Sequence, residues 1–167
     1  MHRFRLFWII FVLGLTVDQI SKTLARSYLA GNDVISLLNG CLEFRYVENS
    51  EGFLGYLHFL PQEVRLQLLT TGVALLLIVL GYLLFRQNTL SLRQYIAGSL
   101  ILTGGTGNLA DRLLHSGGVI DFMVIGIGSF RTGIFNVGDV SILAGSFYLG
   151  CSLANFSRPF GTPISHT

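Results

Sequence analysis

Two aspartates set among apolar residues, Asp121 and Asp139, are the first candidates for chemistry in this sequence. If their carboxylates meet, like-charge repulsion and partial desolvation would make them share one proton. One carboxylate could then activate a water while the other protonates a scissile carbonyl or leaving amine. Asp139 also precedes an apolar run, where a carboxylate suits a helix N-terminus, so helix capping is an alternative interpretation of that residue.

The composition indicates that these residues are positioned by membrane-spanning helices. The chain has 167 residues, of which 51% are hydrophobic and 12% charged, and its mean hydropathy is +0.61. This is too little polar surface for a soluble globule. About 20 apolar residues span the hydrocarbon layer, which predicts an all-α membrane bundle with four transmembrane helices at about 6–24, 66–85, 94–113 and 138–156.

Basic residues orient the predicted bundle, because Arg and Lys favour the cytoplasmic loops. The basic residues that fall on one side of the bundle are Arg3, Arg5, Arg86, Arg93 and Arg158. Their placement predicts that both termini are cytoplasmic, and the acidic residues then lie on or near the opposite face. This topology explains the net charge of +2, so a nucleic-acid partner is not supported. A cleaved secretory signal over residues 1–30 is the alternative for the first helix, but it would leave an odd number of crossings.

Two extracytoplasmic segments, at about 25–65 and 114–137, connect the predicted helices. Alternating residues on both sides of Asn39-Gly40 predict a β-hairpin. Residues 122–135 are glycine-rich and extended, so the two segments could form a small sheet on the membrane surface. No linker divides the chain, and we expect a single integral membrane domain over residues 1–167.

Polar residues also occur inside the predicted helices, where ionisable groups are costly unless they are paired or hydrated. Asp18 and Lys22 are four residues apart and can pair on one helix face. Asn108, Asp111 and Arg112 follow Gly104 at helical spacings and form one stripe. A structural ion pair, and capping or snorkelling by Asp111 and Arg112, are the alternatives to a role in chemistry.

These blocks together resemble lipoprotein signal peptidase (signal peptidase II), the membrane aspartyl protease of bacteria. The resemblance covers nearly the whole chain and rests on five blocks in the family's order, which are Asp18-Gln19-Ile20-Ser21-Lys22, Asn49, the run from Gly104 to Arg112, Val119-Ile120-Asp121-Phe122 and Phe135-Asn136-Val137-Gly138-Asp139. It implies four helices in the bacterial inner membrane, with an extracytoplasmic β-cradle and an interfacial segment.

The resemblance also implies the reaction and the roles of the residues. Asp121 and Asp139 would activate a water that cleaves a prolipoprotein before its diacylglyceryl-modified cysteine, with no cofactor or metal. Asn108, Arg112 and Asn136 would position the substrate or the dyad. The remaining members, which would support the site, are Asp18, Lys22, Asn49 and Asp111. Partners would be lipid-modified prolipoproteins and membrane lipids, and we expect a monomer.

The sequence departs from the family pattern after Asn49, where it continues Ser50-Glu51-Gly52-Phe53-Leu54-Gly55. Gly138 and Val140 also flank Asp139 where the family usually has Ala and Ser. Since the two aspartates are unchanged, we expect catalysis to be retained. A specialised paralogue that cleaves one or a few lipoproteins is our hypothesis for the altered loop.

Two other functional classes use the same residues. In an intramembrane proton- or ion-coupled transporter the acidic residues would line a path, but here they gather towards one face. A catalytically inactive lipoprotein-binding scaffold could keep the fold, although the retained Asp121 and Asp139 argue against it. Peptide cleavage separates both classes from a peptidase.

Overall fold

Helices make up most of the chain in the computed structural model, which describes residues 2–51, 57 and 59–156. The long apolar runs fold as the sequence predicts. The helical elements in chain order are α1 (His2–Leu29), α2 (Gln62–Gln67), the π-helical turn η3 (Leu68–Gly72), α3 (Val73–Arg86), α4 (Leu92–Leu114) and α5 (Val137–Phe156). Each predicted helix is present, and each is one to nine residues longer in total than predicted.

Within the part of the chain that the structure describes, three helical stretches are long and apolar enough to cross a membrane: His2–Leu29, Gln62–Arg86 and Val137–Ala154. The fourth predicted span, α4, has 23 residues but contains many glycines and polar residues. It packs against α1, α3 and α5, and eleven of its residues are buried, against five in α1. Helix α4 is therefore the central helix of the bundle, and its crossing of the membrane stays a prediction.

Glycines allow α4 to lie close to its neighbours. A Cβ at Gly104 would collide with the backbone of Gly138 in α5, and one at Gly105 would collide with Leu77 of α3. Small residues permit this close approach of helices in membrane proteins. Gly104 and Gly105 thus let α4 approach α5 and α3 closely.

A four-stranded antiparallel sheet joins the two outer segments, in the order β1-β2-β3-β4. Its strands are β1 (Ile35–Leu37), β2 (Leu42–Asn49), β3 (Val119–Ile127) and β4 (Phe130–Arg131). The predicted hairpin turn is present, with positive φ angles of 54° at Asn39 and 85° at Gly40. Strand β3 begins three residues earlier than the predicted extended segment, so Asp121 lies in the sheet.

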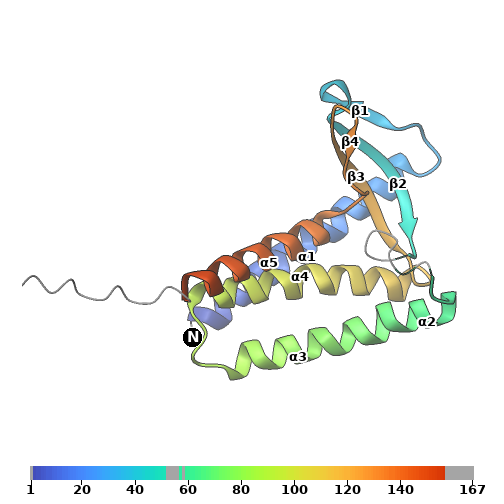
Figure 1. The fold of residues 1–167 in the computed structure, drawn as a ribbon. Helices are drawn as coiled ribbons and strands as arrows, with labels where there is room; N and C mark the ends of the chain where they lie inside the picture. Colours follow the sequence, from blue (N-terminus) through green and yellow to red (C-terminus); the bar gives the residue numbers. More distant parts are fainter. Residues whose placement is uncertain (1, 52–56, 58, 157–167) are drawn as a thin grey trace, which may run out of the picture.

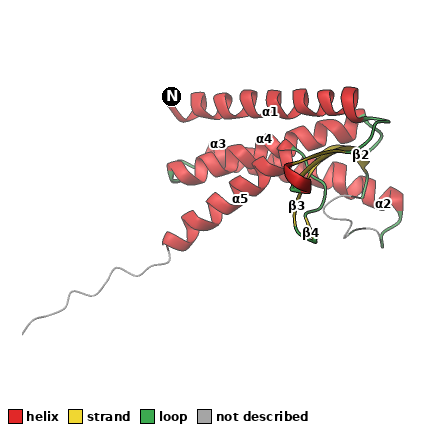
Figure 2. Ribbon diagram, turned by 90° about the horizontal axis from the view of Figure 1, so that it is seen from above, coloured by secondary structure: helices red, strands yellow, loops and turns green. Residues whose placement is uncertain are grey.

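The sheet lies at the end of the bundle opposite the N-terminus (Figure 1). Seen from above, α1 and α3 run in a similar direction and α5 diverges obliquely from them, while the sheet lies away from the N-terminus (Figure 2). Ala25 and Leu29 of α1 are buried against Ile120 and Phe122 of β3. The end of α1, the end of α4 and the start of α5 therefore meet beneath the sheet. Of the divergent loop at 50–55, residues 52–55 lie outside the described residues.

Candidate active site

One buried side chain, Asn136, binds both predicted catalytic aspartates. Its Nδ2 donates to Oδ1 of Asp121 at 2.7 Å, and its backbone N–H donates to Oδ2 of Asp139 at 3.1 Å. Its Oδ1 accepts from the backbone N–H of Asp139 at 2.9 Å. Asn136 has no exposed surface. The two carboxylates, 18 residues apart in sequence, therefore belong to one site.

The same bonds cap helix α5. Asn136 precedes the first helical residue and Asp139 is the third, so their reciprocal hydrogen bonds resemble a capping box. The capping interpretation of Asp139 is confirmed, and it is compatible with a place in the site. The cap fixes the carboxylate relative to the start of α5.

Asp121 lies in β3 opposite Val47 of β2. Its Oδ2 accepts a hydrogen bond from Nδ2 of Asn49 at 2.8 Å, and the residue is 3% exposed. Burial raises the pKa of Asp121 to about 6, and the nearby charge of Asp139 acts in the same direction. The hydrogen bonds from Asn49 and Asn136 oppose this rise. A carboxylate that titrates near neutral pH is typical of acid–base sites.

Asn108 of α4 connects the dyad to helix α1. Its Nδ2 donates to Oδ1 of Asp139 at 2.8 Å, while its Oδ1 accepts from Nζ of Lys22 at 2.9 Å and from Asn136 at 3.1 Å. The predicted stripe on α4 therefore faces the site through Asn108. This placement agrees with the expected positioning role.

Lys22 lies between two carboxylates below the dyad. Its Nζ is 2.8 Å from Oδ2 of Asp18 and 2.9 Å from Oδ2 of Asp111, and all three residues are 1% exposed. The predicted Asp18–Lys22 pair is present, and Asp111 joins it. Asp111 thus neither caps nor snorkels.

Gln19 was missed among the candidate residues. Its Nε2 donates to Asp18 at 3.1 Å and to Oδ1 of Asp111 at 3.2 Å. Its position next to Asp18 was the available sequence signal for a place in the site. That signal is weak, because the sequence does not show whether an uncharged amide is buried or hydrogen-bonded.

Arg112 is half-buried, and among the described residues its Nε has no hydrogen-bond partner. The hydrogen bonds and ion pairs of that part of the chain include none from Arg112 to either aspartate of the dyad. Within the described residues, Arg112 therefore does not hold the dyad by a hydrogen bond or an ion pair, and its role towards the substrate stays a prediction.

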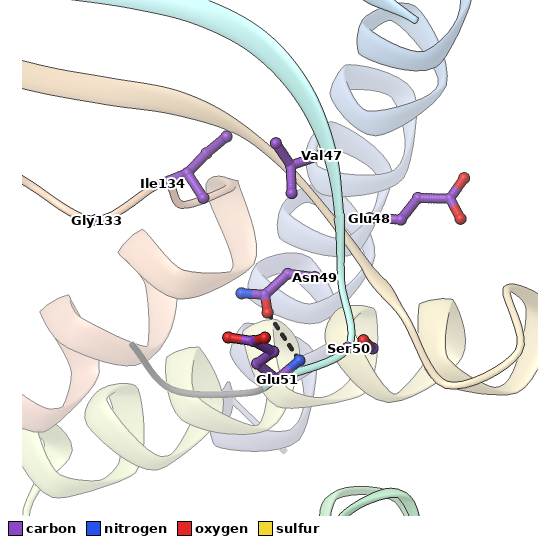
Figure 3. A pocket seen from close by; sticks show the side chains of 7 residues that line it. All are labelled: Val47, Glu48, Asn49, Ser50, Glu51, Gly133 and Ile134. Carbon is purple, nitrogen blue, oxygen red and sulfur yellow. Dashed lines mark hydrogen bonds between the residues drawn. The ribbon is translucent and has the colours of Figure 1, made fainter. Parts of the chain in front are cut away.

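A pocket of about 430 Å³ lies beside Asn49, within the range of small-ligand sites. Figure 3 shows its lining residues, which are Val47, Glu48, Asn49, Ser50, Glu51, Gly133 and Ile134. Asn49 accepts from the backbone N–H of Glu51 while it donates to Asp121. Asn49 therefore lines the pocket and also binds the Asp121 carboxylate, which is not among the lining residues.

Known proteins with similar sequences share one description. The family model for signal peptidase (SPase) II matches residues 10–155. A lipoprotein signal peptidase from Treponema denticola is 34% identical over 145 residues, which cover 83% of each chain. Another, from Nostoc punctiforme, is 35% identical over 161 residues, covering 96% of this chain and 94% of the relative.

Two solved structures, both titled as bacterial membrane enzymes determined by the in meso method, share the fold. One aligns with a TM-score of 0.79 at 23% identity and covers 95% of this chain and 94% of its own. The other aligns with a TM-score of 0.76 at 24% identity, with coverages of 88% and 91%. The arrangement of helices and sheet is therefore the fold of these two structures.

Proposed function

The chain belongs to the signal peptidase II family, and from this premise we propose that it removes the signal peptide of prolipoproteins by means of an Asp121–Asp139 dyad. The observation that carries the mechanism is the bridge through Asn136, which hydrogen-bonds to both carboxylates. Two neighbouring carboxylates that repel each other can share one proton.

The proposed reaction is hydrolysis without a covalent enzyme intermediate. The ionised carboxylate takes a proton from water, whose oxygen attacks the carbonyl carbon before the diacylglyceryl-modified cysteine. The protonated carboxyl donates to the carbonyl oxygen. The C–N bond then breaks as the amine takes the proton that the first carboxyl removed from water, and the second carboxylate takes back a proton from the tetrahedral hydroxyl. A pKa of about 6 suits Asp121 to hold or release the shared proton near neutral pH.

Neighbouring residues supply positioning in this proposal. Asn108 and Asn136 hold the dyad, and Asn49, which lines the pocket, holds Asp121. Arg112, whose Nε has no partner within the described part of the chain, would donate to the substrate. Asp18, Lys22 and Asp111 support the site from below.

We also propose that α4 crosses the membrane, which gives four crossings and a single integral membrane domain. The bundle end that carries Arg3, Arg5, Arg86 and Arg93 would then be cytoplasmic, with both termini there. The sheet and the dyad would lie at the extracytoplasmic face of the bacterial inner membrane. The substrate's acyl chains could stay in the bilayer while its peptide reaches the pocket.

Purified protein mixed with a diacylglyceryl-modified lipoprotein precursor tests the proposal. We expect release of the signal peptide, measured by gel shift and mass spectrometry, and no release from the precursor that lacks the lipid. Failure to cleave a panel of modified precursors would contradict peptidase function. Ion flux in proteoliposomes without any cleavage would favour the transporter class instead.

A further inference from the structure

We propose that Lys22 is a positioning residue that fixes the two catalytic aspartates relative to each other through Asp18 and Asp111. The inference rests on the proposed function and deepens it. It concerns a layer of the protein that does not touch the reacting atoms. The evidence is that each carboxylate beside Lys22 also holds the backbone immediately before one member of the dyad.

The first connection runs from α1 to α5. Lys22 binds Oδ2 of Asp18, and Oδ1 of Asp18 accepts from the backbone N–H of Gly138 at 2.7 Å. Gly138 directly precedes Asp139. A Cβ at Gly107 would collide with the Asp18 carboxylate, so the glycine on α4 leaves the space in which this carboxylate lies.

The second connection runs from α1 through α4 to the sheet. Lys22 binds Oδ2 of Asp111, and the same oxygen accepts from the backbone N–H of Ile120 at 3.1 Å. Ile120 directly precedes Asp121. One ammonium group therefore links the two carboxylates that hold the peptide groups on the N-terminal side of Asp121 and Asp139.

The third connection orients an amide. Lys22 donates to Oδ1 of Asn108 at 2.9 Å, which directs the Nδ2 group of Asn108 to Asp139. The Lys22 ammonium donates hydrogen bonds to Asp18 and Asn108 and forms an ion pair with Asp111. An uncharged side chain at position 22 would leave all three groups without this common partner.

The charge of Lys22 gives a second, separate readout. Lys22 lowers the pKa of Asp121, against the effects of burial and of Asp139. The charged groups near Lys22 are Asp18 on its own helix, Asp111 on α4, Asp121 on β3 and Asp139 on α5. Arg112 on α4 is a second cation near both aspartates of the dyad. Removing the cation should therefore change the pH dependence of the reaction as well as its rate.

The test compares Lys22→Met and Lys22→Arg with wild type in cleavage of a lipid-modified precursor. We expect Lys22→Met to lower kcat about 10²-fold, as for a displacement of about 1 Å, while KM changes less than about threefold. The pH–rate midpoint nearest pH 6 should rise. Lys22→Arg keeps the charge but not the geometry, so it should keep the midpoint and lower kcat.

Leu102→Ala is the matched control, because it removes buried volume from a separate apolar cluster that contains Phe7 and Leu84 and lies outside the site. It should lower thermal stability but leave the pH–rate midpoint unchanged. If Lys22→Met shows the kcat and midpoint of Leu102→Ala, Lys22 is only structural and the inference is wrong. Should Lys22→Met not fold, Asp111→Asn replaces it, and an unchanged kcat there would equally overturn the inference.

The two levels of proposal fail differently. If wild-type protein cleaves no modified precursor, the proposed function is wrong. If wild type and Leu102→Ala cleave but Lys22→Met is as fast as wild type, the peptidase assignment stands and only the role of Lys22 is lost.

Discussion

Replacing Asp121 by Asn should make the protein more stable at pH 8 and less stable at pH 4. The pKa of Asp121 is about 6 in the folded protein, against an ordinary value of 3.8. Because the folded state holds this proton more tightly, Asp121 contributes stability that is fully present below pH 3.8 and is lost as the pH rises through about 6. Two pH units correspond to about 3 kcal/mol.

The variant also loses one hydrogen bond. Asp121 accepts from the amide groups of Asn49 and Asn136, one on each oxygen. An Asn at this position offers a single oxygen, so one bond worth about 1 kcal/mol is lost. At pH 4 the Asp121 contribution is already slightly reduced, so the net difference from wild type should be about −0.5 kcal/mol there and about +2 kcal/mol at pH 8.

Reversible unfolding in mixed micelles, with SDS as denaturant and far-UV circular dichroism as the signal, measures this difference at a series of pH values. Asp33→Asn, at an exposed loop position, is the control and should show no sign change. A constant stability difference between Asp121→Asn and wild type from pH 4 to pH 8 would refute the argument. It would mean that Asp121 is not held as a buried carboxylate.

Three further changes address the parts around the dyad. Asn136→Ala removes the amide that donates to the Asp121 carboxylate and accepts from the backbone N–H of Asp139, so kcat on a lipid-modified precursor should fall about 10²-fold; an unchanged kcat would contradict this. Gly107→Ala should cost about 1–3 kcal/mol in the unfolding assay, because its methyl group would collide with a neighbouring carboxylate. Gly150→Ala, in open space, should change stability by less than about 1 kcal/mol. Asn49→Ala removes a hydrogen bond that lowers the pKa of Asp121. The pH at which the stability contribution of Asp121 is half lost should therefore move above about 6, and a lower value would contradict the geometry.

Local patterns predicted much of the fold. Apolar runs between charged residues located the helices, and Asn39-Gly40 located the hairpin because both residues adopt positive φ there. The spacing of Asp18 and Lys22 predicted their pair. These features depend on residues close in sequence, where helix and turn geometry decide which side chains meet.

The contacts that build the site depend on pairing across long stretches of chain. Asn49 and Asp121 are 72 residues apart in sequence, and the pairing of β2 with β3 brings them together. The residue pattern of a strand does not identify the strand with which it pairs. The backbone donors of Ile120 and Gly138 also left no sequence signal, since every residue other than proline carries an N–H. The sequence pattern located helix α4 but did not identify α1, α3 and α5 together as its neighbours.

Cleavage of one lipid-modified precursor by wild type, Asp121→Asn and Asp139→Asn tests the dyad most directly, with the folded state of each variant checked by circular dichroism. The account predicts that either substitution lowers kcat by roughly 10³-fold or more, because each removes one partner of the acid–base pair. Cleavage that persists undiminished in both variants would contradict the assignment of Asp121 and Asp139 as the catalytic pair.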